Sequence, residues 1–322
     1  MKAAAAILLA LIGLWESGVA GAEPGHCRTV RMSDPGWSDI AATNGVAGAL
    51  LSALGYTQHI DLLAVPLTYH ALAHNEIDVF LGNWMPAQRA LVDPPLREGS
   101  IDLLAANLDD GKFTLAVPDY VAASGVRSFD DLARFGDLFG HHIFGIGAGA
   151  PANEAILRML EAKDYSLGDW ELVESSEQGM LSQLERVLRR KQWIVILAWE
   201  PHPMNLKYPI VYLSGGERYF GPDFGRTTIN TVTRRNYAKD CPNLARLFRQ
   251  LHFQATQEDD LMQEIERRKA DPQTVAAEFL TSHRGQLPAL LEGVTTWDGG
   301  DGLMAVERVL DRAAACTPTG RC

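Results

Sequence analysis

Short apolar runs alternate along most of the chain with longer stretches in which apolar residues recur at the spacing of an amphipathic helix. The runs predict strands at residues 29–32, 60–65, 79–82, 113–117, 142–146, 171–173, 194–197 and 229–233. The stretches predict helices at residues 40–54, 69–75, 128–135, 153–162, 180–190, 243–255 and 271–281. Strands that alternate with helices in this way are typical of an α/β fold with a parallel sheet.

The first residues follow a different pattern. Lys2 precedes a short apolar run at residues 3–14, and Ala20-Gly21-Ala22 matches the small-residue cleavage site of a secretory signal peptide. An apolar run of this length is too short to span a bilayer, which needs about 20 residues. We therefore expect residues 1–22 to be a signal peptide that is cleaved after Ala22, and the mature protein to act outside the cytoplasm.

Length and charge narrow the possible functions. The chain has 322 residues, which is more than one hydrophobic core usually holds, so two lobes are expected. Its formal net charge of −11 at pH 7 argues against a nucleic acid as a partner.

Four cysteines in an exported protein indicate disulfide bonds, for which three connectivities are possible. Cys316 and Cys322 lie together in a tail and could close a small loop, which would leave Cys27 to pair with Cys241. A bond between Cys27 and Cys241 would place the two ends of the chain in one lobe.

The middle of the chain would then form the second lobe. We expect residues 23–113 and 214–322 to form lobe A, residues 114–213 to form lobe B, and the chain to cross between them near residues 112–117 and 208–215. A cleft between two α/β lobes joined by two segments can close on a small ligand by a hinge motion.

Three of the seven tryptophans occupy one kind of position, because each follows a predicted strand where the chain turns toward the next element. They are Trp37, Trp84 and Trp199. Ligands of open parallel sheets lie beyond the carboxyl ends of the strands, so these three side chains are candidate ligand contacts. Phe113 lies at the expected crossing between the lobes, and Asp39 follows Trp37 by two residues.

Several aromatic faces with one carboxylate suit a cation that cannot donate hydrogen bonds. A quaternary ammonium group is such a cation, and the ring quadrupoles stabilise it. Any one of the tryptophans could instead be structural, and Asp39 could be a first-turn helix residue after an N-capping Ser38. The joint pattern favours a quaternary ammonium site.

One motif points to a different function. Residues 145–150, G-I-G-A-G-A, fit the dinucleotide pattern after a predicted strand, and Glu174 ends a later strand as that pattern requires. The chain would then be an exported dinucleotide-dependent enzyme. However, Pro151 and Asn153 delay the helix beyond the glycines, and the motif lies in lobe B rather than in a complete nucleotide-binding domain. We therefore expect no cofactor.

Other signals for chemistry are weak. His70 and His74 have the i, i+4 spacing of a helix face but lack the glutamate of a zinc motif, which favours a solvated face. No G-x-S-x-G nucleophile motif occurs. We expect neither a metal site nor catalytic residues.

Five segments resemble one family of transport proteins. They read S-D-P-G-W-S-D, D-V-F-L-G-N-W-M-P, V-E-S-S-E-Q-G-M-L-S-Q, R-R-K-Q-W-I-V and W-E-P-H-P-M-N. They resemble the glycine betaine/choline class of ABC-transporter substrate-binding proteins, and within it the choline-binding branch. The resemblance runs from about Cys27 to Gly302. It implies a two-lobed periplasmic-binding-protein fold of type II and a periplasmic monomer that delivers its ligand to a membrane permease and is not an enzyme.

By this resemblance, Trp37, Trp84 and Trp199 would form an aromatic box around a trimethylammonium group, with Asp39 beside it. Cys27 and Cys241 match the disulfide of the family, which agrees with the pairing reached from the tail cysteines.

Two positions depart from the choline pattern. Phe113 stands where choline binders usually carry tyrosine, and Ala150 stands where an asparagine would meet the choline hydroxyl, with Asn153 nearby. We include Phe113 and Asn153 in the predicted ligand site. The expected ligand is choline, ahead of carnitine, glycine betaine or another trimethylammonium compound. A sensor role for the same fold is the alternative to transport.

Overall fold

The computed structural model describes residues 22–315. The predicted signal peptide, apart from Ala22, and both tail cysteines, Cys316 and Cys322, lie outside the described residues. No helix in the described part of the chain is long and apolar enough to cross a membrane.

One nine-stranded sheet runs through the molecule. Its strands follow the order β2-β1-β3-β9-β4-β7-β5-β6, and β8 pairs with β4 off this path. The strands are β1 (Thr29–Asp34), β2 (Thr57–Leu62), β3 (Val79–Met85), β4 (Ile101–Pro118), β5 (His142–Phe144), β6 (Glu171–Val173), β7 (Ile196–Glu200), β8 (Ile210–Tyr212) and β9 (Arg226–Arg234). β1 pairs in parallel with β2 and β3, and β5 pairs in parallel with β6 and β7, whereas β4 and β9 are antiparallel to their neighbours.

Helices from both halves of the chain cover the sheet. The first half of the chain supplies η1 (Gly25–Cys27), α1 (Ser38–Ala53), α2 (Val65–Ala73), α3 (Arg89–Glu98), α4 (Asp119–Ala123), α5 (Phe129–Leu132), η2 (Ala133–Phe135), α6 (Gly136–Phe139) and α7 (Pro151–Glu161). The second half supplies η3 (Asp164–Ser166), α8 (Glu177–Arg190), α9 (Met204–Lys207), α10 (Glu217–Phe220), α11 (Pro222–Gly225), α12 (Tyr237–Asp240), α13 (Pro242–Gln250), α14 (Ala255–Arg268), α15 (Pro272–Ser282), η4 (Arg284–Gln286), α16 (Leu287–Leu290) and α17 (Gly302–Ala315).

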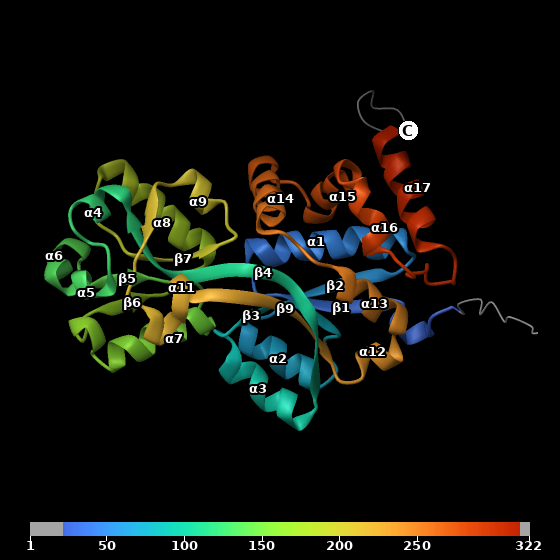
Figure 1. Cartoon of the computed structure of the whole chain (residues 1–322), viewed down its shortest axis with the longest axis horizontal. Helices are drawn as coiled ribbons and strands as arrows, with labels where there is room; N and C mark the ends of the chain where they lie inside the picture. Colours follow the sequence, from blue (N-terminus) through green and yellow to red (C-terminus); the bar gives the residue numbers. More distant parts are fainter. Residues whose placement is uncertain (1–21, 316–322) are drawn as a thin grey trace, which may run out of the picture.

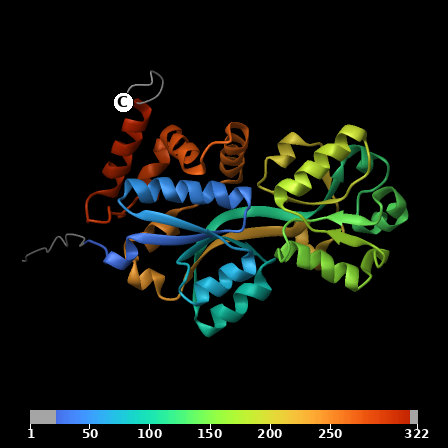
Figure 2. The same cartoon turned by 180° about the vertical axis from the view of Figure 1, so that it is seen from behind.

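The helices gather in two groups, which form two lobes at opposite ends of the sheet, and each lobe contains helices from both halves of the chain (Figure 1). In lobe A, α1, α14, α15 and α17 lie on one face of β1, β2 and β3, and α2 and α3 lie on the other, which the reverse view confirms (Figure 2). In lobe B, α7 and α8 lie on opposite faces of the sheet. The predicted α/β, two-lobed fold is confirmed, while the exact residue boundaries between the lobes stay a prediction.

β4 is the strand that joins the lobes. It has 18 residues, and its first part pairs with β9 while its last part pairs with β7 and β8. β4 and β9 run side by side between the two groups of helices in both views (Figures 1 and 2). The segment near residues 208–215, expected as the second crossing, contains β8, whose residues pair with Ala116–Pro118 of β4. Farther along the chain, β9 pairs with both β4 and β3.

Several helices were not predicted from the sequence. α3 was not predicted because it contains Pro94 and Pro95, which normally end a helix. α14 and α17 were not predicted either. The predicted helix at residues 128–135 is divided into α5, η2 and α6.

The predicted disulfide is present between Cys27 and Cys241, and both residues are buried. It links η1, just before β1, to the start of α13. Beside it, Glu23 accepts hydrogen bonds from the Tyr56 hydroxyl at 2.7 Å and from the Asn243 backbone N–H at 2.6 Å. The beginning and the later part of the described chain are thus joined in lobe A, as the cysteine pattern predicted.

Candidate functional site

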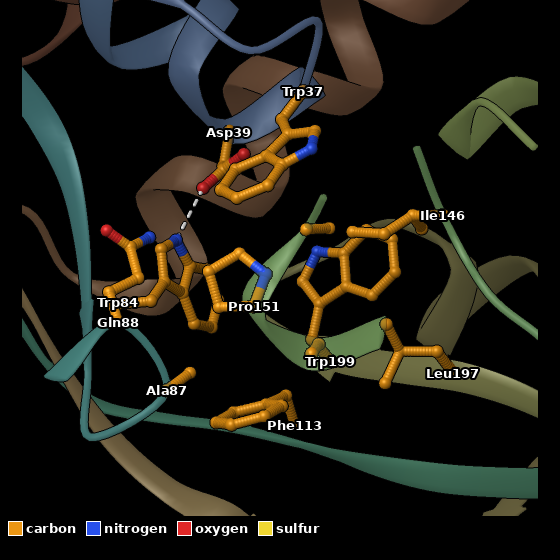
Figure 3. Close-up of a pocket in the computed structure, with 12 residues that line it drawn as sticks. Trp37, Asp39, Trp84, Ala87, Gln88, Phe113, Ile146, Pro151, Leu197 and Trp199 are labelled. Atoms are coloured by element: carbon orange, nitrogen blue, oxygen red, sulfur yellow. Dashed lines mark hydrogen bonds between the residues drawn. The ribbon is translucent and has the colours of Figure 1, made fainter. Parts of the chain in front are cut away.

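A pocket with mainly apolar walls lies where the two lobes meet (Figure 3). Its wall includes five of the six predicted ligand-binding residues, and Asn153 is the exception. The lining residues are Trp37, Asp39, Trp84, Ala87, Gln88, Phe113, Ile146, Ala150, Pro151, Ala152, Leu197 and Trp199.

Lobe A places Trp37 and Asp39 on one wall. Trp37 is the N-cap residue of α1 and has an extended backbone, so Ser38 is the first residue of the helix and not its N-cap. Asp39 lies in the first helical turn, where the helix dipole favours a carboxylate. The turn between β1 and α1 therefore directs an indole and a carboxylate toward the same cavity (Figure 3).

Trp84 holds Asp39 in place. Its indole Nε1 donates a hydrogen bond of 3.1 Å to Oδ2 of Asp39 (Figure 3). Trp84 lies inside β3 rather than beyond its end, because the strand continues to Met85 beside β9. Both side chains are buried, with Trp84 7% and Asp39 2% exposed.

The register between β4 and β7 brings Phe113 and Trp199 together. These two residues are directly paired across the antiparallel strands, so their side chains leave the sheet on the same face. The ring of Phe113 meets the ring of Trp84 edge-on, with centroids 6.5 Å apart, and it also contacts Phe220 at 5.7 Å. Aromatic residues from both lobes thus surround one space.

The backbone of Gly225 packs closely against the backbone of Phe113. Gly225, at the end of α11, has a φ of +74°, and a Cβ atom there would lie 2.0 Å from the carbonyl oxygen of Phe113. Only glycine fits this position without moving the strand.

Asp39 is the only ionisable residue of the described wall. Burial, followed by the negative charge of Glu177, raises the pKa of Asp39 to about 7, although the hydrogen bond from Trp84 acts in the opposite direction. Ionisation of the Asp39 carboxyl group is therefore unfavourable on its own. A bound cation would offset that cost.

Glu258 is a second buried carboxyl group behind the site, on α14. Burial, followed by the charges of Asp39 and Asp259, holds the pKa of Glu258 well above its ordinary value. Its Oε2 has no hydrogen-bond partner among the described residues. Burial therefore disfavours the charged form of Glu258, as it does that of Asp39.

Gln88 is the other polar side chain of the wall, and both of its polar atoms make hydrogen bonds. Its Oε1 accepts a hydrogen bond of 2.6 Å from the Tyr69 hydroxyl, and its Nε2 donates one of 2.7 Å to the carbonyl of Gly82. These two hydrogen bonds hold Gln88 in the wall, and its NH2 group keeps one further N–H.

Asn153 is not part of the pocket wall. Its Oδ1 accepts the Ile146 backbone N–H at 3.1 Å, and its Nδ2 donates to the Ile146 carbonyl at 2.8 Å and to Glu174 Oε1 at 2.9 Å. The residue holds the loop that carries Ile146 and Ala150 into the wall. Its predicted place in the ligand site is not supported by this geometry, because the amide is fully engaged with the loop.

The same contacts explain the glycine motif at residues 145–150. A Cβ atom on Gly145 would lie 2.4 Å from Asn153 Oδ1, so glycine is needed for the loop to close on the asparagine. Glu174, which the dinucleotide pattern would direct to a ribose, is hydrogen-bonded to Asn153. Gly145, the first glycine of the motif, therefore has a structural role in this loop.

The histidine pair noted in the sequence lies apart from the pocket. The rings of His70 and His74 stack with centroids 4.1 Å apart, and His74 Nδ1 lies 2.8 Å from the His70 carbonyl oxygen. Within residues 22–315, the one group of three potential metal ligands within reach of one another is His26, Cys27 and Cys241. The two sulfur atoms of that group form the disulfide.

Sequence reasoning missed Glu177 and His202, which lie beside the pocket behind Trp37 and Trp199. Both occur in segments that resemble the transport family, so the segments marked the region. Their pairing across the cleft could not be seen without the structure.

Comparison with known proteins gives the relatives of the chain. A model of the family described as the substrate binding domain of ABC-type glycine betaine transport system matches residues 28–282. An ABC-transporter choline binding protein in complex with choline is 42% identical, with a TM-score of 0.88 over 89% of this chain and 100% of that one. An unliganded, semi-closed choline binding protein structure, also 42% identical, gives a TM-score of 0.82 over 88% of this chain and 99% of that one.

A curated relative is more distant. The glycine betaine/carnitine transport binding protein of Listeria monocytogenes is 26% identical over 191 residues, which cover 59% of this chain and 60% of that protein.

Replacing Asp39 with asparagine tests the buried carboxyl group in ligand-free protein. Because the folded state keeps this proton up to about pH 7 and the unfolded chain releases it near pH 4, the wild-type free energy of unfolding should fall as pH rises between these values. Asp39→Asn keeps an oxygen for Trp84 but cannot ionise. Its stability, measured by urea unfolding at pH 5 and pH 8, should fall less than that of wild type.

Asp260→Asn is the matched control, because Asp260 is an exposed residue of α14 with the same change of chemistry. It should follow the wild-type pH profile. Parallel profiles for wild type and Asp39→Asn would contradict the interpretation of Asp39.

Proposed function

Since the chain belongs to the family of substrate-binding domains of ABC-type glycine betaine transport systems, we propose that it captures a quaternary ammonium compound, with choline as the first candidate. It delivers this ligand to the membrane permease of an ABC importer. The proposal also includes a periplasmic location after removal of residues 1–22, action as a monomer, and binding without catalysis.

The observation that carries this proposal is the composition of the pocket wall. Three indoles and one phenyl ring, contributed by both lobes, face a space that contains a single carboxylate. A quaternary ammonium ion is weakly hydrated, so it loses little on leaving water and gains from the negative faces of the rings. Each desolvated contact of this kind contributes about 2 kcal/mol, so three or four of them contribute about 6–8 kcal/mol. Burial of the methyl groups in the apolar pocket adds to this and helps to offset the costs of association.

The wall suits a quaternary ammonium group better than a primary one. A primary ammonium group needs three hydrogen-bond acceptors when it is buried. The described wall offers the Asp39 carboxylate, one oxygen of which already accepts from Trp84. A trimethylammonium group has no N–H and needs no hydrogen-bond acceptor, and Asp39 provides the opposite charge.

The polar end of the ligand decides among the trimethylammonium compounds. Phe113 and Ala150 have no polar side-chain atom, so a choline hydroxyl relies on the remaining polar atoms of the wall, on water or on backbone groups. A carboxylated ligand such as glycine betaine or carnitine brings a negative charge toward Asp39 and Glu177, and no basic side chain belongs to the described wall. Choline is therefore favoured over the carboxylated compounds.

Calorimetric titration of ligand-stripped protein with choline, tetramethylammonium and glycine betaine tests the ligand class. We expect micromolar binding of choline, and tetramethylammonium within about tenfold of it, because the rings of the wall bind the quaternary ammonium group that the two ligands share. Glycine betaine should bind at least about tenfold more weakly. Tighter binding of glycine betaine than of choline would contradict this proposal.

Removing one indole at a time tests the aromatic box. Trp37→Leu and Trp199→Leu keep an apolar side chain but remove the ring quadrupole, so each should weaken choline binding about 30-fold or more. Trp193→Leu is the matched control, because Trp193 packs against Phe135 and Phe139 and is not part of the wall. Full affinity in both box variants, measured by the same titration, would refute the assignment.

A further inference from the structure

Three polar residues meet directly behind the aromatic box. The Ser38 backbone N–H donates to Glu177 Oε2 at 3.3 Å, and the Ser38 hydroxyl donates a short hydrogen bond to Glu177 Oε1. His202 Nε2 lies 3.2 Å from Glu177 Oε1 and 3.3 Å from Ser38 Oγ. The side chains of Glu177 and His202 are only 1% and 3% exposed.

These hydrogen bonds cross from one lobe to the other. Ser38 begins α1 of lobe A, whereas Glu177 begins α8 and His202 follows β7, both in lobe B. α1 and α8 belong to different groups of helices in Figure 1. A groove beside the cluster is lined by residues of both helices, including Ala41 and Leu181. The cluster therefore exists only while the lobes are closed.

The histidine is fixed in one tautomer. Its Nδ1 accepts a hydrogen bond of 2.9 Å from the Met204 backbone N–H, so in the neutral ring the proton lies on Nε2. Nε2–H then points to the Glu177 carboxylate. With both Ser38 donors and His202 in place, the buried carboxylate has the hydrogen bonds that it needs.

The cluster is joined to the ligand-binding residues at both ends. Ser38 lies between Trp37 and Asp39 in the chain, so fixing Ser38 fixes the turn that presents those two residues. On the other side, the ring of His202 packs against the ring of Trp199, with centroids 4.9 Å apart at 70°. The same three residues therefore connect the two halves of the aromatic box.

We propose that Ser38, Glu177 and His202 are positioning residues that form an interlobe latch and keep the aromatic box closed around its ligand. The inference rests on the proposed function, because the latch closes on the same ligand. None of the three needs to touch the cation. Their effect is to slow its release, since the lobes can separate only after the hydrogen bonds to the Glu177 carboxylate break.

Stopped-flow measurement of choline association and dissociation tests the latch. Ser38→Ala removes the hydroxyl donor but keeps the backbone N–H and the charge of the site. It should raise the dissociation rate at least about tenfold, while the association rate changes less than about threefold. Glu177→Gln removes the negative charge and replaces one of the two acceptor oxygens with an NH2 donor, so the Ser38 and His202 donors can no longer all be satisfied, and it should raise the dissociation rate further.

Ser182→Ala is the matched control, because Ser182 lies in α8 and lines the same groove but makes no side-chain hydrogen bond among the described residues. It should release choline at the wild-type rate. The melting temperature of ligand-free Ser38→Ala should equal that of wild type, which a general loss of structure would not allow.

The possible results separate the two proposals. Wild-type binding with unchanged dissociation in both Ser38→Ala and Glu177→Gln would overturn the latch alone. A wild-type protein that binds no quaternary ammonium compound would overturn the proposed function, and the latch with it.

Discussion

The structure of the site depends on one buried carboxylate and on the hydrogen bond that holds it. Asp39 is almost fully enclosed, and the Trp84 indole N–H is its side-chain donor in the pocket. Ionising a buried acid beside Glu177 is unfavourable, which is why the pKa of Asp39 rises to about 7. A permanent cation without hydrogens to donate removes that cost better than a hydrated one, because it brings charge without a demand for acceptors.

The fold supplies this site by bringing distant segments together. β4 carries Phe113 beside Trp199 of β7, and its earlier residues pair with β9, which in turn pairs with β3 and places Trp84 nearby. The Cys27–Cys241 disulfide holds the segment before β1 against the later part of lobe A. The Ser38, Glu177 and His202 cluster then connects the two walls. The rings of the wall come from both lobes, so the pocket is complete only where the two lobes meet.

The sequence was sufficient to predict the fold class, the disulfide and the aromatic residues of the wall, because these depend on local patterns. Trp37 and Asp39 were identified because they follow a predicted strand where a helix begins. The position of the two tail cysteines suggested the bond between Cys27 and Cys241. The role of Asn153 could not be predicted, because its spacing from the glycine loop does not say whether the amide faces the cavity or the loop. Glu177 and His202 were missed for a related reason: their partner, Ser38, is far away in the chain and meets them only across the cleft. The exact lobe boundaries stay a prediction, because β4 pairs with β9 in its first part and with β7 and β8 in its last part.

Calorimetric titration of choline at pH 7 in buffers with different ionisation enthalpies tests the central claim most directly. If a cation is held by Asp39, its binding must shift the carboxyl group from partly protonated to ionised, so a fraction of a proton should be released for each choline bound. The apparent binding enthalpy should then vary linearly with the ionisation enthalpy of the buffer, and the Asp39→Asn variant should lose this dependence. Choline binding with no buffer dependence in the wild-type protein would contradict the account, because Asp39 would then not ionise when the cation binds.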